Sequence, residues 1–296
     1  MMFRNFLLLI PLIIIPSVNS MRPWAKDDIK AGEVILTPYV ADKSSNAPAV
    51  IVCPGGSYCW LDVKGEGIEV AEWLRDNGIN AFLLQYRTAG FGAYLTRYRF
   101  VARGNRHPDM ICDVQRAIRF VREKADTLGI DPGCVGVMGF SAGGHLALCA
   151  ACFSGTDYTD LPQKGVSGVS LRPDFVAAIY PVVTMKGEYV HKRSRRGLLG
   201  EWGKYNNELR EQMSIEEHIP ADCPPVFMIN CKDDPVVDWH NSVMLDEALT
   251  KAGIEHKYIQ YETGKHGFGV SEVYGTAESR KWKNEFLEWL KPYMNR

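Results

Sequence analysis

The chain has 296 residues, of which 46% are apolar and 23% are charged, a composition typical of a globular protein with one large core. Its 34 basic and 35 acidic side chains give a formal net charge of −1, so no overall field favours nucleic acid or an anionic membrane surface. We therefore expect a single domain over residues 21–296 that takes a small or neutral ligand.

The first 20 residues differ in composition from the rest of the chain. An apolar run over residues 6–15 follows a basic residue, and the small residues Val18 and Ser20 then suit signal-peptidase cleavage. Residues 1–20 are therefore predicted to be a secretory signal, which places the mature protein in the periplasm or outside the cell. The run is shorter than the roughly 20 apolar residues that a spanning helix needs. A start at Met21, giving a cytoplasmic protein, is the less favoured alternative.

After this segment, short apolar runs alternate with stretches of helical periodicity. The runs predicted to form strands cover residues 33–39, 50–53, 81–84, 135–138, 175–180, 226–230 and 257–261. Helices are predicted around residues 68–74, 110–121, 142–148, 242–252 and 277–290. Strands separated by helices of this length form βαβ units, so the sequence predicts an α/β fold whose mostly parallel sheet is covered by helices on both faces.

One long segment, at about residues 185–222, departs from this alternation. It is predicted to cap or border the active site. It contains the basic run His191–Arg196, which would suit an anion or nucleic-acid site. Because the run is short and the whole chain is balanced in charge, a solvated loop or a helix start is the favoured interpretation.

Eight cysteines in an exported protein would ordinarily indicate disulfides. However, Cys53, Cys134 and Cys231 lie in or beside predicted strands, and Cys149 and Cys152 share one face of a predicted helix. Most of the cysteines are therefore interpreted as small buried side chains with free thiols. No second pair of Cys or His residues has the spacing of zinc ligands, so neither a metal nor another cofactor is expected.

The segment Gly139–His145 carries the pattern G-x-S-x-G between a predicted strand and a small-residue helix. In α/β hydrolases this turn presents a nucleophilic serine, because glycines on both sides allow a turn too tight for side chains. Ser141 is therefore predicted to be the nucleophile.

A serine nucleophile needs a base and a carboxylate that orients the base, and in this fold both follow the serine along the chain. His266 lies in a glycine-rich loop after the last predicted strand and is predicted to be the base. The carboxylate is Asp233 or Asp234, which follow the preceding strand; Asp234 is favoured, and Asp238 is a weaker candidate.

The oxyanion formed during acyl transfer needs two backbone donors. The N–H of Ala142 is one candidate. The glycine-rich loop after the strand over residues 50–53 is the other, with Gly56 as the first choice and Ser57 as the second. Five aromatic residues could stack on a substrate ring, although packing explains them equally well: Tyr58, Trp60, Tyr94, Tyr98 and Trp202. Of these, Tyr58, Trp60 and Trp202 are predicted to bind the substrate.

Several motifs occur together along the chain. They are Pro54–Tyr58, Asp113–Arg122, Gly139–His145, Leu198–Gly200, Asp233–Val237 and Lys265–Gly269. Over about residues 33–292 this set resembles the bacterial acetylxylan esterase and feruloyl esterase group of α/β hydrolases. The resemblance implies a Ser-Asp-His triad, no metal, and removal of acyl groups from plant hemicellulose.

The sequence thus predicts a serine carboxylesterase that acts on acetylated, and alternatively feruloylated, xylan fragments through an acyl-enzyme. A serine peptidase of the prolyl-oligopeptidase type shares the same turn and triad order, but usually carries a large accessory domain. A non-catalytic carbohydrate-binding protein on a hydrolase scaffold is the alternative from another class. The serine, aspartate and histidine in their proper order argue against it.

Overall fold

The computed structural model describes residues 21, 34–41, 46–95, 104–159 and 168–294; the predicted signal segment lies outside these ranges. Seven strands form one sheet in the order β1-β3-β2-β4-β5-β6-β7. They are β1 (Ile35–Tyr39), β2 (Ala47–Cys53), β3 (Asn80–Gln85), β4 (Ile130–Phe140), β5 (Val176–Ile179), β6 (Val226–Cys231) and β7 (His256–Tyr261). Only β1 runs antiparallel to its neighbour, so the predicted mostly parallel sheet is confirmed.

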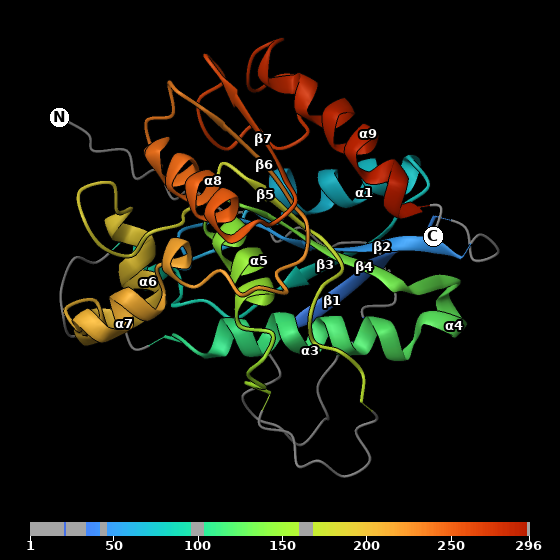
Figure 1. The fold of residues 1–296 in the computed structure, drawn as a ribbon, viewed down its shortest axis with the longest axis horizontal. Helices are drawn as coiled ribbons and strands as arrows, with labels where there is room; N and C mark the ends of the chain where they lie inside the picture. Colours follow the sequence, from blue (N-terminus) through green and yellow to red (C-terminus); the bar gives the residue numbers. More distant parts are fainter. Residues whose placement is uncertain (1–20, 22–33, 42–45, 96–103, 160–167, 295–296) are drawn as a thin grey trace, which may run out of the picture.

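Helices cover both faces of this sheet (Figure 1). Their bounds, with those of the shorter helical turns, are η2 (Lys64–Ile68), α1 (Glu69–Asp76), α2 (Phe91–Leu95), α3 (Asp109–Glu123), α4 (Ala125–Leu128), α5 (Ala142–Cys152), α6 (Lys192–Gly203), α7 (Asn207–Gln212), η3 (Ile215–Glu217), α8 (His240–Ala252), η4 (Ser279–Lys281) and α9 (Trp282–Met294). Buried side chains of α3, α5 and α8 form one core with the sheet, and those of α1 and α9 form another.

Strand β2 shows why the sheet is buried on both faces. All seven of its residues are buried. Because successive side chains of a strand point to opposite faces, Ile51 and Cys53 join the core under α3 and α5, whereas Val50 and Val52 join the core under α1 and α9. A continuous apolar run of this kind is expected of a central parallel strand.

The segment 185–222 folds mainly as two helices, α6 and α7, at the left of Figure 1. Helix α6 begins at Lys192, inside the basic run, so the expected helix start is confirmed. Asn206 caps α7 by accepting a hydrogen bond from the N–H of Leu209. The short helix α2 was not predicted, because its five residues are too few to give a periodic pattern.

All eight cysteines have free thiols; seven are buried and Cys152 is partly exposed. This agrees with the interpretation of most of them as small core residues. Within the described ranges, no helix is both long enough and apolar enough to cross a bilayer.

Four parallel strands end at the same edge of the sheet, where sites of α/β proteins collect. The Pro54–Tyr58 loop follows β2, Ser141 follows β4, Asp233 and Asp234 follow β6, and His266 follows β7. The topology therefore brings the predicted site residues to one place.

Candidate active site

Ser141 lies at the turn between β4 and α5, with φ 54° and ψ −116°. A Cβ at Gly139 would lie 1.9 Å from the carbonyl oxygen of Gly143, and a Cβ at Gly143 would lie 2.0 Å from the carbonyl oxygen of Cys53. Only glycine fits at both positions. The close packing of these glycines therefore holds Ser141 in a strained backbone conformation at the N-terminus of α5.

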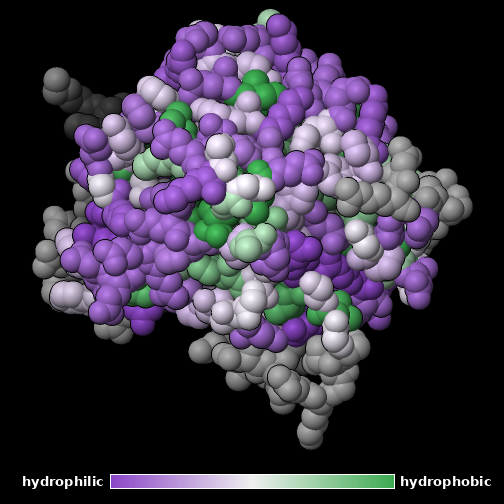
Figure 2. Space-filling view, viewed as in Figure 1, coloured by the Kyte–Doolittle hydropathy of each residue, from purple (hydrophilic) through white to green (hydrophobic). Residues whose placement is uncertain are grey.

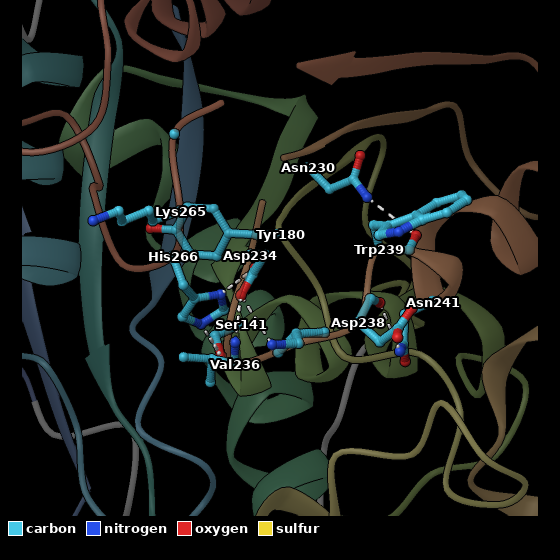
Figure 3. Close-up of polar contacts among 12 residues, drawn as sticks. Ser141, Tyr180, Asn230, Asp234, Val236, Asp238, Trp239, Asn241, Lys265 and His266 are labelled. Carbon is cyan, nitrogen blue, oxygen red and sulfur yellow. Dashed lines mark hydrogen bonds and ion pairs between the residues drawn. The ribbon is translucent and has the colours of Figure 1, made fainter. Parts of the chain in front are cut away.

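The side chains of Ser141, His266 and Asp234 form one hydrogen-bonded chain (Figure 3). Nδ1 of His266 lies 2.6 Å from Oδ2 of Asp234, and Nε2 lies 2.9 Å from Oγ of Ser141. When Nδ1–H donates to the carboxylate, Nε2 is left as the acceptor of the serine hydroxyl proton. This arrangement is suited to acyl transfer by a serine.

The three candidate carboxylates have different partners. The side chain of Asp234 is almost fully buried. Its Oδ1 accepts hydrogen bonds from the N–H groups of Val236 and Val237, while Oδ2 faces His266. Oδ1 of Asp233 accepts from the N–H groups of Gly264 and Lys265, and so fixes the loop that carries His266.

Asp238 is bonded locally to His240 and points away from the imidazole (Figure 3). Of the three candidates, only Asp234 contacts His266. The geometry therefore agrees with the choice of Asp234 as the triad carboxylate. Asp238 instead accepts a hydrogen bond from the backbone N–H of His240, at the start of α8.

The candidate oxyanion donors lie around Ser141. Gly56, Ser57 and Tyr58 have successive positive φ angles of 134°, 58° and 60°, and turns of this kind make concave rows of N–H groups. Within the described residues, no acceptor is bonded to the N–H groups of Gly56 and Ser57. A Cβ at Gly56 would lie 2.1 Å from the carbonyl oxygen of Trp60, so the turn requires glycine there.

Ala142 follows Ser141 as the first residue of α5, where N–H groups have no partner inside the helix. The structure thus brings Gly56, Ser57 and Ala142 together beside the serine hydroxyl.

A cavity of about 230 Å³ opens over Ser141 and His266. Gly56 and Ser57 form one side, and Trp60 and Arg193 contribute to its rim. Arg193 belongs to α6, so the segment 185–222 does border the cavity. Within the described part of the chain, no group of three or more His, Cys, Asp or Glu side chains is placed to hold a metal ion.

A second buried carboxylate, that of Glu66, was missed in the sequence. Its Oε2 accepts a hydrogen bond of 2.7 Å from the N–H of Gly55, and its Oε1 accepts one of 2.9 Å from the hydroxyl of Tyr180. The same hydroxyl accepts from the N–H of Gly269 at 3.0 Å, and the Tyr180 ring packs on that of His266 with centroids 4.7 Å apart. Glu66 thus ties the Gly56 loop to the His266 loop.

Burial shifts the pKa values of two groups near the site, Glu66 and His191. Burial raises the pKa of Glu66, whereas the nearby His266 and the hydrogen bond from Tyr180 act in the opposite direction. Burial, together with the charges of His266 and Arg193, lowers the pKa of His191 to about 4. His191 is therefore neutral at pH 7 and adds no charge beside His266.

Two of the three predicted substrate contacts are corrected by the structure. Tyr58 is fully buried, and its hydroxyl lies 2.8 Å from Nδ1 of His145, so it supports the Gly56 loop from beneath and cannot stack on a substrate ring. Trp202 is exposed and is not among the residues that line the cavity. Trp60 does line the cavity and is 39% exposed.

Comparisons with known proteins agree with this architecture. The BD-FAE family model matches residues 36–249. An acetylxylan esterase of Xylanibacter ruminicola is 31% identical over 90% of this chain and 49% of its own length. An endo-1,4-beta-xylanase B of Butyrivibrio fibrisolvens is 30% identical over 80% of this chain and 35% of its own length. The chain therefore spans about half or less of these curated relatives.

Among solved structures, an acetyl ester-xyloside bifunctional hydrolase from Caldicellulosiruptor lactoaceticus is similar with a TM-score of 0.79 and 31% identity, over 95% of this chain and 98% of that one. A thermophilic esterase from Thermogutta terrifontis, at 22% identity and a TM-score of 0.68 over 94% and 91% of the two chains, shares the fold. Together with the family match, these similarities show that the chain belongs to the BD-FAE family, in the acetylxylan esterase and feruloyl esterase group of α/β hydrolases.

Proposed function

We propose that this chain is a serine carboxylesterase that removes acetyl groups from xylan fragments. The observation that carries this proposal is the hydrogen-bonded chain Ser141–His266–Asp234 at the floor of a cavity. In this mechanism Oγ of Ser141 attacks the ester carbonyl while Nε2 of His266 takes the hydroxyl proton. Asp234 holds the imidazole in the required tautomer and stabilises its charged form.

The negative charge that develops on the carbonyl oxygen is stabilised by the N–H groups of Gly56 and Ala142. The N–H of Ser57 is the second choice on the Gly56 side. His266 then returns its proton to the leaving sugar oxygen, which leaves an acyl-enzyme on Ser141. Water, activated by the same imidazole, attacks the acyl carbonyl and releases the carboxylic acid.

Two observations support the substrate class. The relatives named above are an acetylxylan esterase, a xylanase and an acetyl ester-xyloside hydrolase. In addition, the cavity of about 230 Å³ is smaller than the roughly 300–1,000 Å³ typical of pockets for drug-sized ligands. A cavity of this size favours a small acyl group, so acetyl is the expected substituent and feruloyl is the alternative.

Release of acetate and ferulate from acetylated and feruloylated xylo-oligosaccharides tests this proposal, with a proline-containing peptide in parallel. We expect acetate release that falls by roughly 10⁶ in kcat when Ser141→Ala is introduced. Activity on simple aryl acetates alone would keep the mechanism and reject the substrate. Cleavage of the peptide in preference to the esters would favour the peptidase alternative, and near-normal hydrolysis by Ser141→Ala would refute the nucleophile.

We also propose that residues 1–20 direct export, because their apolar run and small residues suit signal-peptidase cleavage. N-terminal analysis of the protein made in a bacterial host checks this. A mature chain that begins after Ser20 in the periplasm or medium is expected, and an uncleaved chain in the cytoplasm would contradict it.

A further inference from the structure

A second depression, which we call the basic groove, lies beside the active-site cavity. It has a volume of about 620 Å³ and is bordered by α2 and α6. Tyr94 and Arg193 line both the groove and the cavity. The groove and the cavity therefore adjoin at these two side chains.

Five positively charged side chains of α6 and its C-terminal end line the groove: Lys192, Arg193, Arg195, Arg196 and Lys204. None of the described lining residues is acidic. Two of the five form ion pairs with the carboxylate of Glu201. Its Oε2 lies 2.6 Å from Nζ of Lys204, and its Oε1 lies 3.5 Å from Nε of Arg196. Figure 2 shows a strongly hydrophilic surface over α6 and α7.

The remaining three cations have no carboxylate partner among the described ion pairs. Lys192 and Arg193 are exposed. Arg195 is half-buried, and burial together with the neighbouring Arg210 lowers its pKa. Because the whole chain has a net charge of only −1, this concentration of positive charge is local, and it creates a site where an anion would relieve repulsion between like charges.

Aromatic rings lie between the groove and the cavity. The guanidinium of Arg193 stacks on Tyr94 at 4.4 Å, and Tyr94 in turn contacts Phe91 and Trp60 at ring separations of 5.6 and 6.4 Å. Arg193 and Phe91 both stack on Tyr94, so the exposed rings are those of Phe91 and Trp60. Exposed aromatic faces suit the apolar faces of sugar rings, while guanidinium groups bind carboxylates with two parallel hydrogen bonds. The combination matches a carbohydrate that carries a carboxylate.

We propose that the basic groove binds a uronic acid unit of the same carbohydrate whose ester lies at Ser141. The enzyme would then prefer acetylated xylan fragments that carry an acidic sugar over neutral ones. This inference rests on the proposed function for its substrate class. The binding site itself does not require ester hydrolysis and can be measured without it.

The test uses the Ser141→Ala protein and two probes without an ester, namely xylotriose that carries one glucuronic acid branch and unbranched xylotriose. Calorimetric titration gives both affinities. We expect the acidic probe to bind at least about tenfold more tightly, as one charge-assisted pair provides. Adding salt should reduce the difference.

Two variants locate the effect. Lys192→Gln alone should lower the affinity for the acidic probe by about two- to fivefold, as expected for one exposed charge. The double variant Lys192→Gln with Arg195→Gln should remove most of the preference for the acidic over the neutral probe. Lys251→Gln, which removes an exposed charge on α8, is the matched control and should retain it. The single variant at exposed Lys192 keeps the test informative if the double variant fails to fold.

Equal affinities for the two probes, no binding of either, or a preference that survives in both groove variants would overturn the proposal. Displacement of the acidic probe by inorganic phosphate at equal concentration would show a general anion site and would overturn the sugar-specific assignment. Because no ester is present, these outcomes are independent of whether acetate is released in the assay of the proposed function.

Discussion

The floor and the rim of the active-site cavity are built in different ways. The floor consists of Ser141 and His266, which line the cavity, and of the buried Asp234 behind His266. These residues lie on short turns at the ends of strands and are fixed by backbone hydrogen bonds and glycines. The rim consists of side chains such as Trp60 and Arg193, which project from loops and helices outside the sheet. Substitutions in the floor should therefore change the chemical step, and those in the rim should change which substrates bind.

The largest difference is expected between Asp233 and Asp234, the two adjacent carboxylates that follow β6. Asp234→Asn should lower kcat by roughly 10⁴, because the amide cannot hold the required histidine tautomer. Asp233→Asn is the matched control. This substitution weakens only the contacts to the N–H groups of Gly264 and Lys265, so kcat is expected to fall by about tenfold. Steady-state kinetics on an aryl acetate measure both, and a greater loss from Asp233→Asn would reverse the assignment.

Glu66, which ties together the loops on either side of Ser141, provides a second test. Glu66→Gln leaves either Gly55 N–H or the Tyr180 hydroxyl without its acceptor, which costs about 1–3 kcal/mol for a buried donor. We expect kcat to fall by about ten- to a hundredfold, with little change in KM, because the loops move relative to Ser141. Exposed Glu72→Gln on α1 is the control.

A purely structural role for Glu66 would lower the unfolding midpoint without this selective loss of kcat. Unfolding in urea, together with kcat and KM determined separately on the same samples, distinguishes the two roles. Equal activity of Glu66→Gln and Glu72→Gln would remove Glu66 from the account of the site.

His145 connects the Gly56 loop with the segment 185–222. Its Nδ1 faces the hydroxyl of Tyr58 under the Gly56 loop, and its Nε2 lies 2.9 Å from the carbonyl oxygen of Met213, in the segment 185–222. Burial lowers its pKa to about 4, below the roughly 6.5 of an unfolded chain. The unfolded state binds more protons between these values, so stability is lost as the pH falls through this window.

Urea unfolding at pH 7.5 and 4.5 measures this loss. Between these two values the wild type should lose about 2–3 kcal/mol more than His145→Asn, which has no imidazole to protonate. His218→Asn, at an exposed histidine, should behave like the wild type. Parallel losses in wild type and His145→Asn would show that protonation of His145 is not involved.

The smallest effect is expected at the rim. Trp60→Ala removes an aromatic face without touching the triad, so KM for an acetylated xylo-oligosaccharide should rise by about threefold to tenfold, the value of one aromatic contact. The kinetics of a small aryl acetate should change less. Trp202→Ala, outside the cavity, is the control. A larger effect from Trp202 would restore it as a substrate contact.

Local patterns explain why the fold and the floor were predictable. The apolar runs mark the strands, and the turn residues around Ser141, Asp234 and His266 lie next to them in the sequence. In a parallel sheet, residues that follow strands meet at one edge. Chain order and local motif together were therefore enough to bring these three residues together.

The remaining features depend on contacts between distant parts of the chain. The partners of Glu66 are Gly55 and Tyr180, and Tyr180 reaches Gly269; none of these pairs has a local pattern. Tyr58 stands in a loop motif that suggested exposure, but its ring turns into the core. The groove arises because α6 places the basic run beside Tyr94, which the run alone does not indicate.

The central claim is that Ser141 is the nucleophile, and covalent labelling tests it most directly. Incubation with a fluorophosphonate followed by peptide mass spectrometry should give one stoichiometric adduct on Ser141. Ser141→Ala should give none, and Asp234→Asn should react much more slowly because its base is impaired. Absence of an adduct in folded wild-type protein, or an adduct on another residue that persists in Ser141→Ala, would contradict the account.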